Sequence, residues 1–168
     1  MNRPNLLTFV RRHPFAALAT VNASGEPQVA IVRFVATAEF EIVFNTTEAT
    51  RKATNLRQNP KVAIAIGWDE SQTIQIEGLA DEPRDRELDR VKKAYSESYP
   101  EFFHARQRAK GLVYFRVRPN WMCYGDFRQN PASIVRYDVR TGDLRQTLEP
   151  FLGDDATGHP DPQPRASG

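Results

Sequence analysis

The spacing of apolar and polar side chains changes several times along the chain. Leu6, Leu7 and Val10 recur every three to four positions, which predicts a short helix over residues 2–13 that ends before Pro14. The pattern then changes to short apolar or alternating runs rich in valine and isoleucine, which is typical of strands. We expect three strands, at residues 15–21, 27–36 and 39–45. Their short connections favour an antiparallel meander.

The second half of the chain mixes short helices with further strands. Helical composition predicts helices at residues 49–58, 85–95 and 102–109. Strand-like runs occur at residues 61–68, 72–80, 111–117, 121–124 and 133–139, and a turn follows at 141–143. The last residues are rich in proline and glycine and poor in apolar side chains. We therefore expect one domain over residues 1–148 and a disordered tail over 149–168.

These runs define the expected fold class. Seven or eight short strands with few helices between them favour a mainly β fold, a barrel more than a sandwich. The helices are too few and too irregularly placed for a doubly wound parallel sheet.

Composition and charge narrow the classes of partner. The chain has 168 residues, 40% of them hydrophobic, and a formal net charge of +2. That charge is too small to indicate nucleic acid or a membrane surface as a partner, so a functional positive charge must be local. Cys123 is the only cysteine, and no apolar run approaches the roughly 20 residues of a membrane span. With no secretory signal pattern at residues 1–4, we expect a cytoplasmic protein.

Residues 44–52 carry the strongest chemical signal. A strand ends there, hydroxyl residues follow, and a helix begins with Arg51 and Lys52. Free N–H groups at a helix start, hydroxyl donors and two cations suit a phosphomonoester. The alternative is a plain helix cap, in which Thr47 caps the helix and both cations face water. Local features alone leave these two interpretations evenly balanced.

The same segment resembles the flavin-phosphate motif of the pyridoxamine 5'-phosphate oxidase family. In that motif a strand-ending aromatic residue and a Thr or Ser precede Ser/Thr-Arg-Lys at the next helix, and this sequence has Phe44, Thr46, Thr50, Arg51 and Lys52 at the matching positions. Residues 17–21, 25–27, 29–34, 59–63 and 74–78 have a similar supporting pattern, and the resemblance covers roughly residues 5–127.

The resemblance implies a split β-barrel that forms a homodimer, with FMN at the interface between the subunits. It implies that Asn45, Thr46, Arg51 and Lys52 hold the phosphate and that the second strand runs beside the isoalloxazine ring. The complete set of expected cofactor-binding residues is Ile31, Val32, Arg33, Asn45, Thr46, Thr50, Arg51, Lys52, Thr73 and Trp121.

This sequence departs from the family's oxidases in three places. Ala30 and Val35 stand where the oxidases carry Arg and Lys, with Arg33 between them, and Thr73 stands where the family has a Gln. The C-terminal motif that grips the pyridoxal product is absent, so vitamin B6 is not the expected substrate. The sequence is more similar to the smaller, general-stress-protein-like branch. We expect an FMN-dependent oxidoreductase acting on an unidentified small substrate; the alternative is a non-catalytic flavin, deazaflavin or haem carrier.

Several other residues have a functional and a structural interpretation. The aromatic run 121–127 suits a flavin wall or, slightly better, a core strand. Aromatic residues 99–103 suit a pocket mouth or, more commonly, packing. Cys123 is better explained as a buried structural thiol than as a nucleophile. The histidines show no metal-ligand spacing, so no metal site is expected. The charge run 85–93 is most simply a solvated helix face, and the sequence identifies no general acid or base.

Overall fold

A computed structural model describes residues 2–106 and 108–150 of the chain. Within these ranges it contains α1 (Arg3–Arg12), β1 (Phe15–Val21), β2 (Pro27–Ala36), β3 (Ile42–Thr47), α2 (Arg51–Gln58), β4 (Lys61–Ile66), β5 (Gln72–Asp81), α3 (Asp85–Ser98), α4 (Pro100–Arg106), β6 (Leu112–Asp126), β7 (Ala132–Asp138) and β8 (Leu144–Glu149). None of the described helices is long and apolar enough to cross a membrane.

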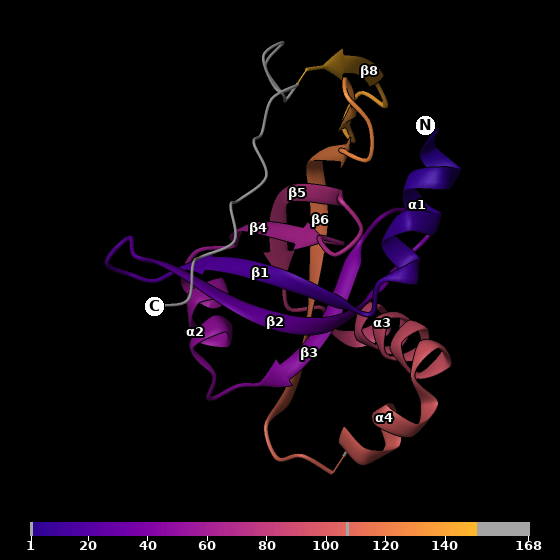
Figure 1. The fold of residues 1–168 in the computed structure, drawn as a ribbon. Coiled ribbons are helices and arrows are strands. Elements are labelled where there is room, and N and C mark those ends of the chain that lie inside the picture. The colour runs from indigo at the N-terminus through magenta and orange to yellow at the C-terminus, as the bar shows by residue number, and fades with distance from the viewer. Residues whose placement is uncertain (1, 107, 151–168) are drawn as a thin grey trace, which may run out of the picture.

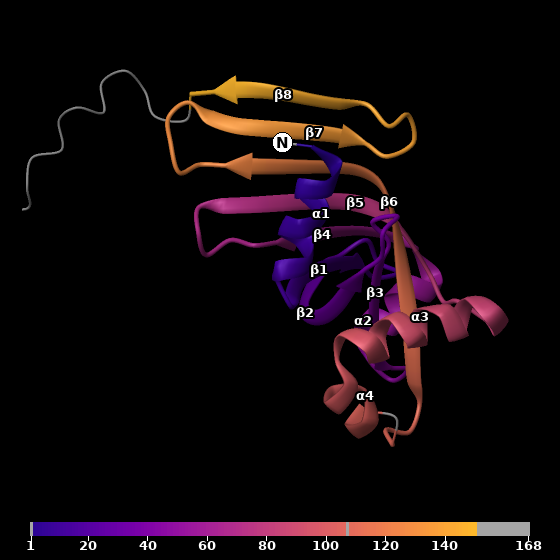
Figure 2. The ribbon, with the colours of Figure 1, turned by 90° about the vertical axis from the view of Figure 1, so that its right-hand side faces the viewer.

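The strands form one antiparallel sheet that closes into a barrel (Figure 1). The order is β3-β2-β1-β4-β5-β6, and β3 also pairs with the first half of β6, with Phe44 opposite Phe115. The second half of β6 leaves the barrel and pairs with β7, which pairs with β8. This hairpin and α4 lie at opposite ends of the molecule (Figure 2). The expected mainly β split barrel is confirmed.

One long strand, β6, replaces the two strands expected at 111–117 and 121–124. The proline between them does not end the strand, because a β-bulge accommodates it. Gly78 of β5 pairs with Pro119, whereas Glu77 pairs with Trp121, so Asn120 is the additional residue. A β-carbon at Gly78 would lie 2.5 Å from the backbone oxygen of Arg118, so the two strands approach closely here.

Other boundaries also differ from the expectation: α3 continues to Ser98 rather than ending at residue 95, and α4 begins at Pro100 rather than at residue 102. β3 begins at Ile42 rather than at residue 39, because the chain turns through Phe40, whose φ of 66° is left-handed and whose ring is fully buried. β8 was not expected as a strand: its four central residues are all exposed, so no alternation of burial marks it. Glu149, expected in the tail, ends β8, and the rest of the expected tail, 151–168, lies outside the described residues.

Two apolar clusters lie on the two sides of β3. Ile42 and Phe44 point into the barrel core, where the rings of Phe44 and Phe115 stack with centroids 5.7 Å apart. Val43 points outwards and joins Val91 and Tyr95 of α3 in a second, smaller cluster. Because side chains alternate along β3, one face of this strand packs in the barrel core and the other packs against α3.

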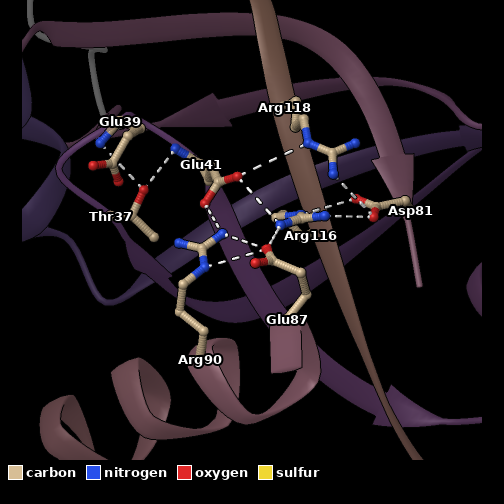
Figure 3. A network of polar contacts seen from close by, with 8 residues as sticks. All are labelled: Thr37, Glu39, Glu41, Asp81, Glu87, Arg90, Arg116 and Arg118. Carbon is tan, nitrogen blue, oxygen red and sulfur yellow. Dashed lines mark hydrogen bonds and ion pairs between the residues drawn. The ribbon is translucent and has the colours of Figure 1, made fainter. Parts of the chain in front are cut away.

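An ion network also ties α3 to the barrel (Figure 3). The Arg116 side chain of β6 is only 4% exposed, and its guanidinium donates to Asp81, with Nη2 2.7 Å from Oδ2, and to Glu87 of α3. Arg90 of α3 donates to Glu41 at 2.7 Å. Glu87 and Arg90 are exposed, as expected for a solvated helix face, but their side chains also bond Arg116 and Glu41 of the barrel. Hydrogen bonds from Arg90 and Arg116 lower the pKa of Glu87.

Candidate functional site

A cavity of about 230 Å³ lies where β2 and β3 meet α2 and the helices α3 and α4; we call it the β2–α4 cavity. Its lining includes six of the residues expected from the sequence to bind a cofactor: Ile31, Val32, Arg33, Asn45, Thr46 and Lys52. The remaining lining residues are Phe15, Tyr95 and Phe102. The structure thus brings residues of three strands, β1, β2 and β3, and of the helices α2, α3 and α4 around one space.

Hydroxyl groups converge at the α2 end of this cavity. The Oγ1 atoms of Thr46 and Thr50 lie 3.1 Å apart, and Lys52 Nζ donates to Thr46 Oγ1 at 3.4 Å. Thr50, not Thr47, is the N-cap residue of α2, and its side chain donates backwards to the Thr47 carbonyl at 2.9 Å. No side-chain hydrogen bond therefore caps α2, and the alternative in which Thr47 caps the helix is wrong. An uncapped helix start next to a lysine favours an anion.

Asn45 contributes a buried donor to the same cavity. Its side chain lies on the outer face of β3 and the residue is 6% exposed. Within residues 2–106 and 108–150, its Nδ2 has no hydrogen-bond partner. A buried donor left unsatisfied costs about 1–3 kcal/mol. An acceptor on a bound ligand would remove that cost, so Asn45 fits a ligand-binding role.

Arg33 lies on β2 among three aromatic rings. Its Cζ is 4.6 Å from the ring centroid of Phe15 and 5.0 Å from those of Tyr99 and Phe102. The Tyr99 hydroxyl donates to the Phe34 carbonyl at 2.8 Å. Burial raises the pKa of that hydroxyl, and Arg33 lowers it to a smaller extent. The three rings hold the guanidinium in place by cation–π contacts.

The charge of the cavity lining is positive. Arg33 and Lys52 line it, and no aspartate, glutamate or histidine does among the residues described. A larger depression of about 650 Å³ lies nearby, between the end of β2 and α3, but it mixes Arg11 and Arg90 with Glu97. Arg90 there donates to Glu41. The smaller cavity is the better anion site, because its lining contains no aspartate or glutamate among the described residues.

Four of the ten expected residues are not part of the cavity lining in the single chain, and one of these, Thr50, contacts the lining residue Thr46. Arg51 is exposed at the first position of α2. Thr73 is half-buried on β5, where its hydroxyl donates to the Ile66 carbonyl at 3.4 Å. Trp121 of β6 lines a separate depression of about 300 Å³ on the outer surface of the barrel, together with Val29. Their part in cofactor binding stays a prediction.

The sequence interpretation missed three lining residues. Phe102 belongs to the aromatic group 99–103, for which packing was the favoured explanation; Phe102 lines the cavity, whereas Phe103 packs in the outer apolar cluster. No local sequence pattern marks Phe15 or Tyr95 as cavity residues. The sequence of a strand start or of a helix face is the same whether or not a cavity lies beside it.

The remaining candidates have structural roles. Met122 and Tyr124 are buried in the barrel core, which confirms the core interpretation for this part of the aromatic run. Cys123 is half-buried, and burial raises the pKa of its thiol, which lowers its reactivity. No group of three or more His, Cys, Asp or Glu side chains that could hold a metal occurs in the described part of the chain.

Comparison with known proteins identifies the family. Residues 3–124 match the family model described as pyridoxamine 5'-phosphate oxidase. The chain belongs to this family. The match covers the whole barrel and both strands of the β2–α4 cavity, and it ends before β7 and β8.

Curated relatives of this oxidase family are distant in sequence. A protein named pyridoxine/pyridoxamine 5'-phosphate oxidase from Leptospira biflexa is 28% identical over 134 residues, which are 79% of this chain and 52% of the relative. One of the same name from Burkholderia mallei is 28% identical over 148 residues, covering 78% and 69%. The chain thus spans about half the length of the Leptospira relatives it matches.

Solved structures of the same fold bind different cofactors. HutZ, the haem storage protein of Vibrio cholerae, is 27% identical with a TM-score of 0.62, covering 71% of this chain and 91% of that one. A pyridoxamine 5'-phosphate oxidase-related, FMN-binding protein from Nostoc punctiforme is 15% identical with a TM-score of 0.61, covering 86% and 90%. A haem-binding protein from Mycobacterium smegmatis is 16% identical with a TM-score of 0.65, covering 88% and 58%.

Proposed function

We propose that the protein binds FMN in the β2–α4 cavity and acts as an FMN-dependent oxidoreductase on a small substrate. The observation that supports this most is the convergence of Lys52, Thr46 and Thr50 at the uncapped start of α2. This cluster matches the chemistry of a phosphomonoester and coincides with the family's flavin-phosphate motif. The family membership of the chain makes FMN the first candidate for that phosphate.

The residues of the cavity fit a flavin nucleotide in chemical type. Lys52, the two hydroxyls and the first N–H groups of α2 would hold the phosphate. Asn45 Nδ2 would donate to the ligand, which would satisfy this buried atom. Ile31 would offer apolar contact beside the ring, and the rings of Tyr95 and Phe102 line the same cavity. When bound, FMN supplies hydride or electron transfer, and the chain supplies binding and orientation.

The phosphate assignment can be tested by removing one charge. In Lys52→Gln we expect the dissociation constant of FMN to rise at least about tenfold, because a charge-assisted hydrogen bond of about 1.5–3 kcal/mol is lost. Titration of purified protein with FMN, followed by quenching of flavin fluorescence, measures it. Lys61→Gln, at an exposed position at the start of β4, is the matched control and should bind as the wild type does. Equal affinity in both variants would contradict the assignment.

We also propose that two copies of the chain form a homodimer with FMN at their interface. Val29 and Ile31 alternate on the outer face of β2 and are 71% and 58% exposed. Val29 lines the depression that contains Trp121, whereas Ile31 lines the β2–α4 cavity, so one apolar strip connects the two. A second copy covering this strip would bury it and bring Thr73 and Trp121 of one chain towards the cavity of the other.

A non-catalytic carrier is the second candidate, with haem, a flavin or a deazaflavin as the ligand. HutZ supports it, since its identity of 27% is similar to that of the oxidases. Adding haemin or FMN to the purified protein separates the two cofactors, because bound haem gives a Soret band and bound FMN a flavin spectrum. If FMN binds, bleaching of its absorbance by NADH or NADPH supports an enzyme. The absence of any response to either reductant supports a carrier.

A further inference from the structure

Arg33 is not needed to explain the phosphate end of the β2–α4 cavity. The phosphate cluster is formed by the start of α2 and the end of β3, whereas Arg33 lies on β2, beneath α4 and the end of α3. No carboxylate lies within 4.0 Å of its guanidinium in residues 2–106 and 108–150. The cavity therefore contains a second cation, whose charge has no acidic partner in the described chain.

The neighbours of Arg33 fix its position and leave its charge unneutralised. Phe15, Tyr99 and Phe102 surround the guanidinium, and we call these three residues the aromatic cage. Aromatic rings attract a cation through their faces but are much weaker acceptors than a carboxylate for its five N–H donors. Tyr99 is itself anchored, because its hydroxyl donates to the Phe34 carbonyl. A planar guanidinium held in this way is ready to bind a planar anion with two parallel hydrogen bonds.

We propose that Arg33 recognises the carboxylate of an acidic substrate, and that the aromatic cage positions it for this. This inference rests on the proposed function, because it assigns the substrate to the same cavity as FMN. The substrate class is a small acid with an apolar body. Ile31, Phe15 and Phe102 form an apolar rim beside Arg33 and are 58%, 42% and 38% exposed. An apolar ring or chain would pack against this rim while its carboxylate meets the guanidinium.

Sodium benzoate is a suitable probe, since it combines a carboxylate with an apolar ring, and benzamide is its uncharged analogue. Binding of each is measured by calorimetry at about pH 7, on protein without flavin and on protein saturated with FMN. We expect Arg33→Met to weaken benzoate binding at least about tenfold, because the charge-assisted pair is lost. Benzamide binding should change little.

A comparison of Arg33→Met with Lys61→Gln separates this inference from the proposed function. With saturating FMN, the exposed control Lys61→Gln should bind benzoate as the wild type does, whereas Arg33→Met should bind benzoate more weakly. Benzoate binding that is absent in the wild type, or equal in Arg33→Met, overturns the inference even if FMN binds. Failure to bind FMN overturns the proposed function, whereas calorimetry on the flavin-free protein still tests Arg33.

The positioning role of the aromatic cage is tested at Phe102, the cage residue that lies on α4. Phe102→Leu removes one ring from Arg33 and should weaken benzoate binding by about two- to fivefold, the range of an exposed cation–π contact. Phe102→Tyr keeps a ring at this position and should restore the affinity. A role in packing alone would change benzoate and benzamide binding equally, and that result would overturn the positioning role.

Discussion

Asp126, at the end of β6, has the most strongly shifted pKa among the described carboxylates. Arg128 Nη2 lies 2.6 Å from its Oδ2 and Arg128 Nε 2.8 Å from its Oδ1, and Gln72 donates to Oδ2 at 3.2 Å. The hydrogen bonds from Arg128 are the largest cause, and they lower the pKa of Asp126 to about 2. Arg12 of α1 donates to Gln72 at 2.8 Å, so this cluster also connects the first helix to the sheet.

This shift predicts how stability depends on pH. Because the folded pKa is lowered, the stabilisation is complete above the ordinary value of 3.8 and is lost as the pH falls towards about 2. In Asp126→Asn we expect about 1 kcal/mol less stability at neutral pH and a shallower loss between pH 4 and 2, since the exposed Arg128 is partly screened by solvent. Urea unfolding at several pH values measures this. Asp143→Asn, in the exposed turn before β8, is the control; identical acid profiles for wild type and Asp126→Asn would refute the prediction.

At the scale of elements, the attachment of α3 decides the shape of the site. Tyr95 of α3 lines the β2–α4 cavity, and Arg116 holds the start of the same helix through Glu87. Removing Arg116 would take from Asp81 its 2.7 Å partner and from Glu87 one of its two arginine partners, the other being Arg90. Half-exposed Glu87 can be hydrated again, so the cost is smaller than for a fully buried pair.

We therefore expect Arg116→Met to lower the free energy of unfolding by about 2–3 kcal/mol. FMN affinity should fall as well, because α3 covers the cavity. Arg118→Met is the matched control: Arg118 bonds the same Asp81 at 3.4 Å but is 56% exposed, so the loss should stay below about 0.5 kcal/mol. Chemical denaturation measures the free energy of unfolding of both variants. Equal losses would show that the burial of Arg116 does not determine its contribution to stability.

The bulge between β5 and β6 is a second element-scale feature with a measurable consequence. Gly78→Ala would place a β-carbon 2.5 Å from the Arg118 backbone oxygen, and a backbone atom cannot move aside as a side chain can. We expect a loss of about 1–3 kcal/mol in unfolding free energy, as for other overpacked sites. Thermal unfolding tests this; an unchanged midpoint would mean that the two strands separate here at no cost.

At the scale of the whole molecule, the proposed dimer leads to a prediction that a monomer would not give. Val29→Glu places a charge on the apolar strip of β2 and should give a monomer with weaker FMN binding, because a buried unpaired charge disrupts an interface. Analytical ultracentrifugation gives the mass, and flavin titration gives the affinity.

Leu148→Glu is the control for this experiment. Leu148 is 63% exposed, similar to Val29, but it lies on β8, at the other end of the molecule from α4 (Figure 2). We expect this variant to keep the mass and FMN affinity of the wild type. If the wild type is a monomer and still binds FMN fully, the proposal that two chains share the FMN site is refuted.

The sequence by itself determined the local elements and the local part of the site. The bounds of β1 and β2 are as expected, since the alternation of side chains is a property of neighbouring residues. The start of α2 near Thr50 and Lys52 also follows from local composition. Arg33 was expected at the site through family resemblance, and the structure places it in the cavity lining.

Tertiary structure alone decided what surrounds these residues. The pairing of Phe44 with Phe115 joins positions far apart in the chain, and no local pattern specifies it. The placement of Phe15 and Phe102 around Arg33 depends on that closure and on the packing of α3. β8 was missed because its pairing with β7, rather than any burial of its own side chains, makes it a strand. Side-chain periodicity is set within a few residues, whereas a cavity is formed by elements that meet only when the barrel closes.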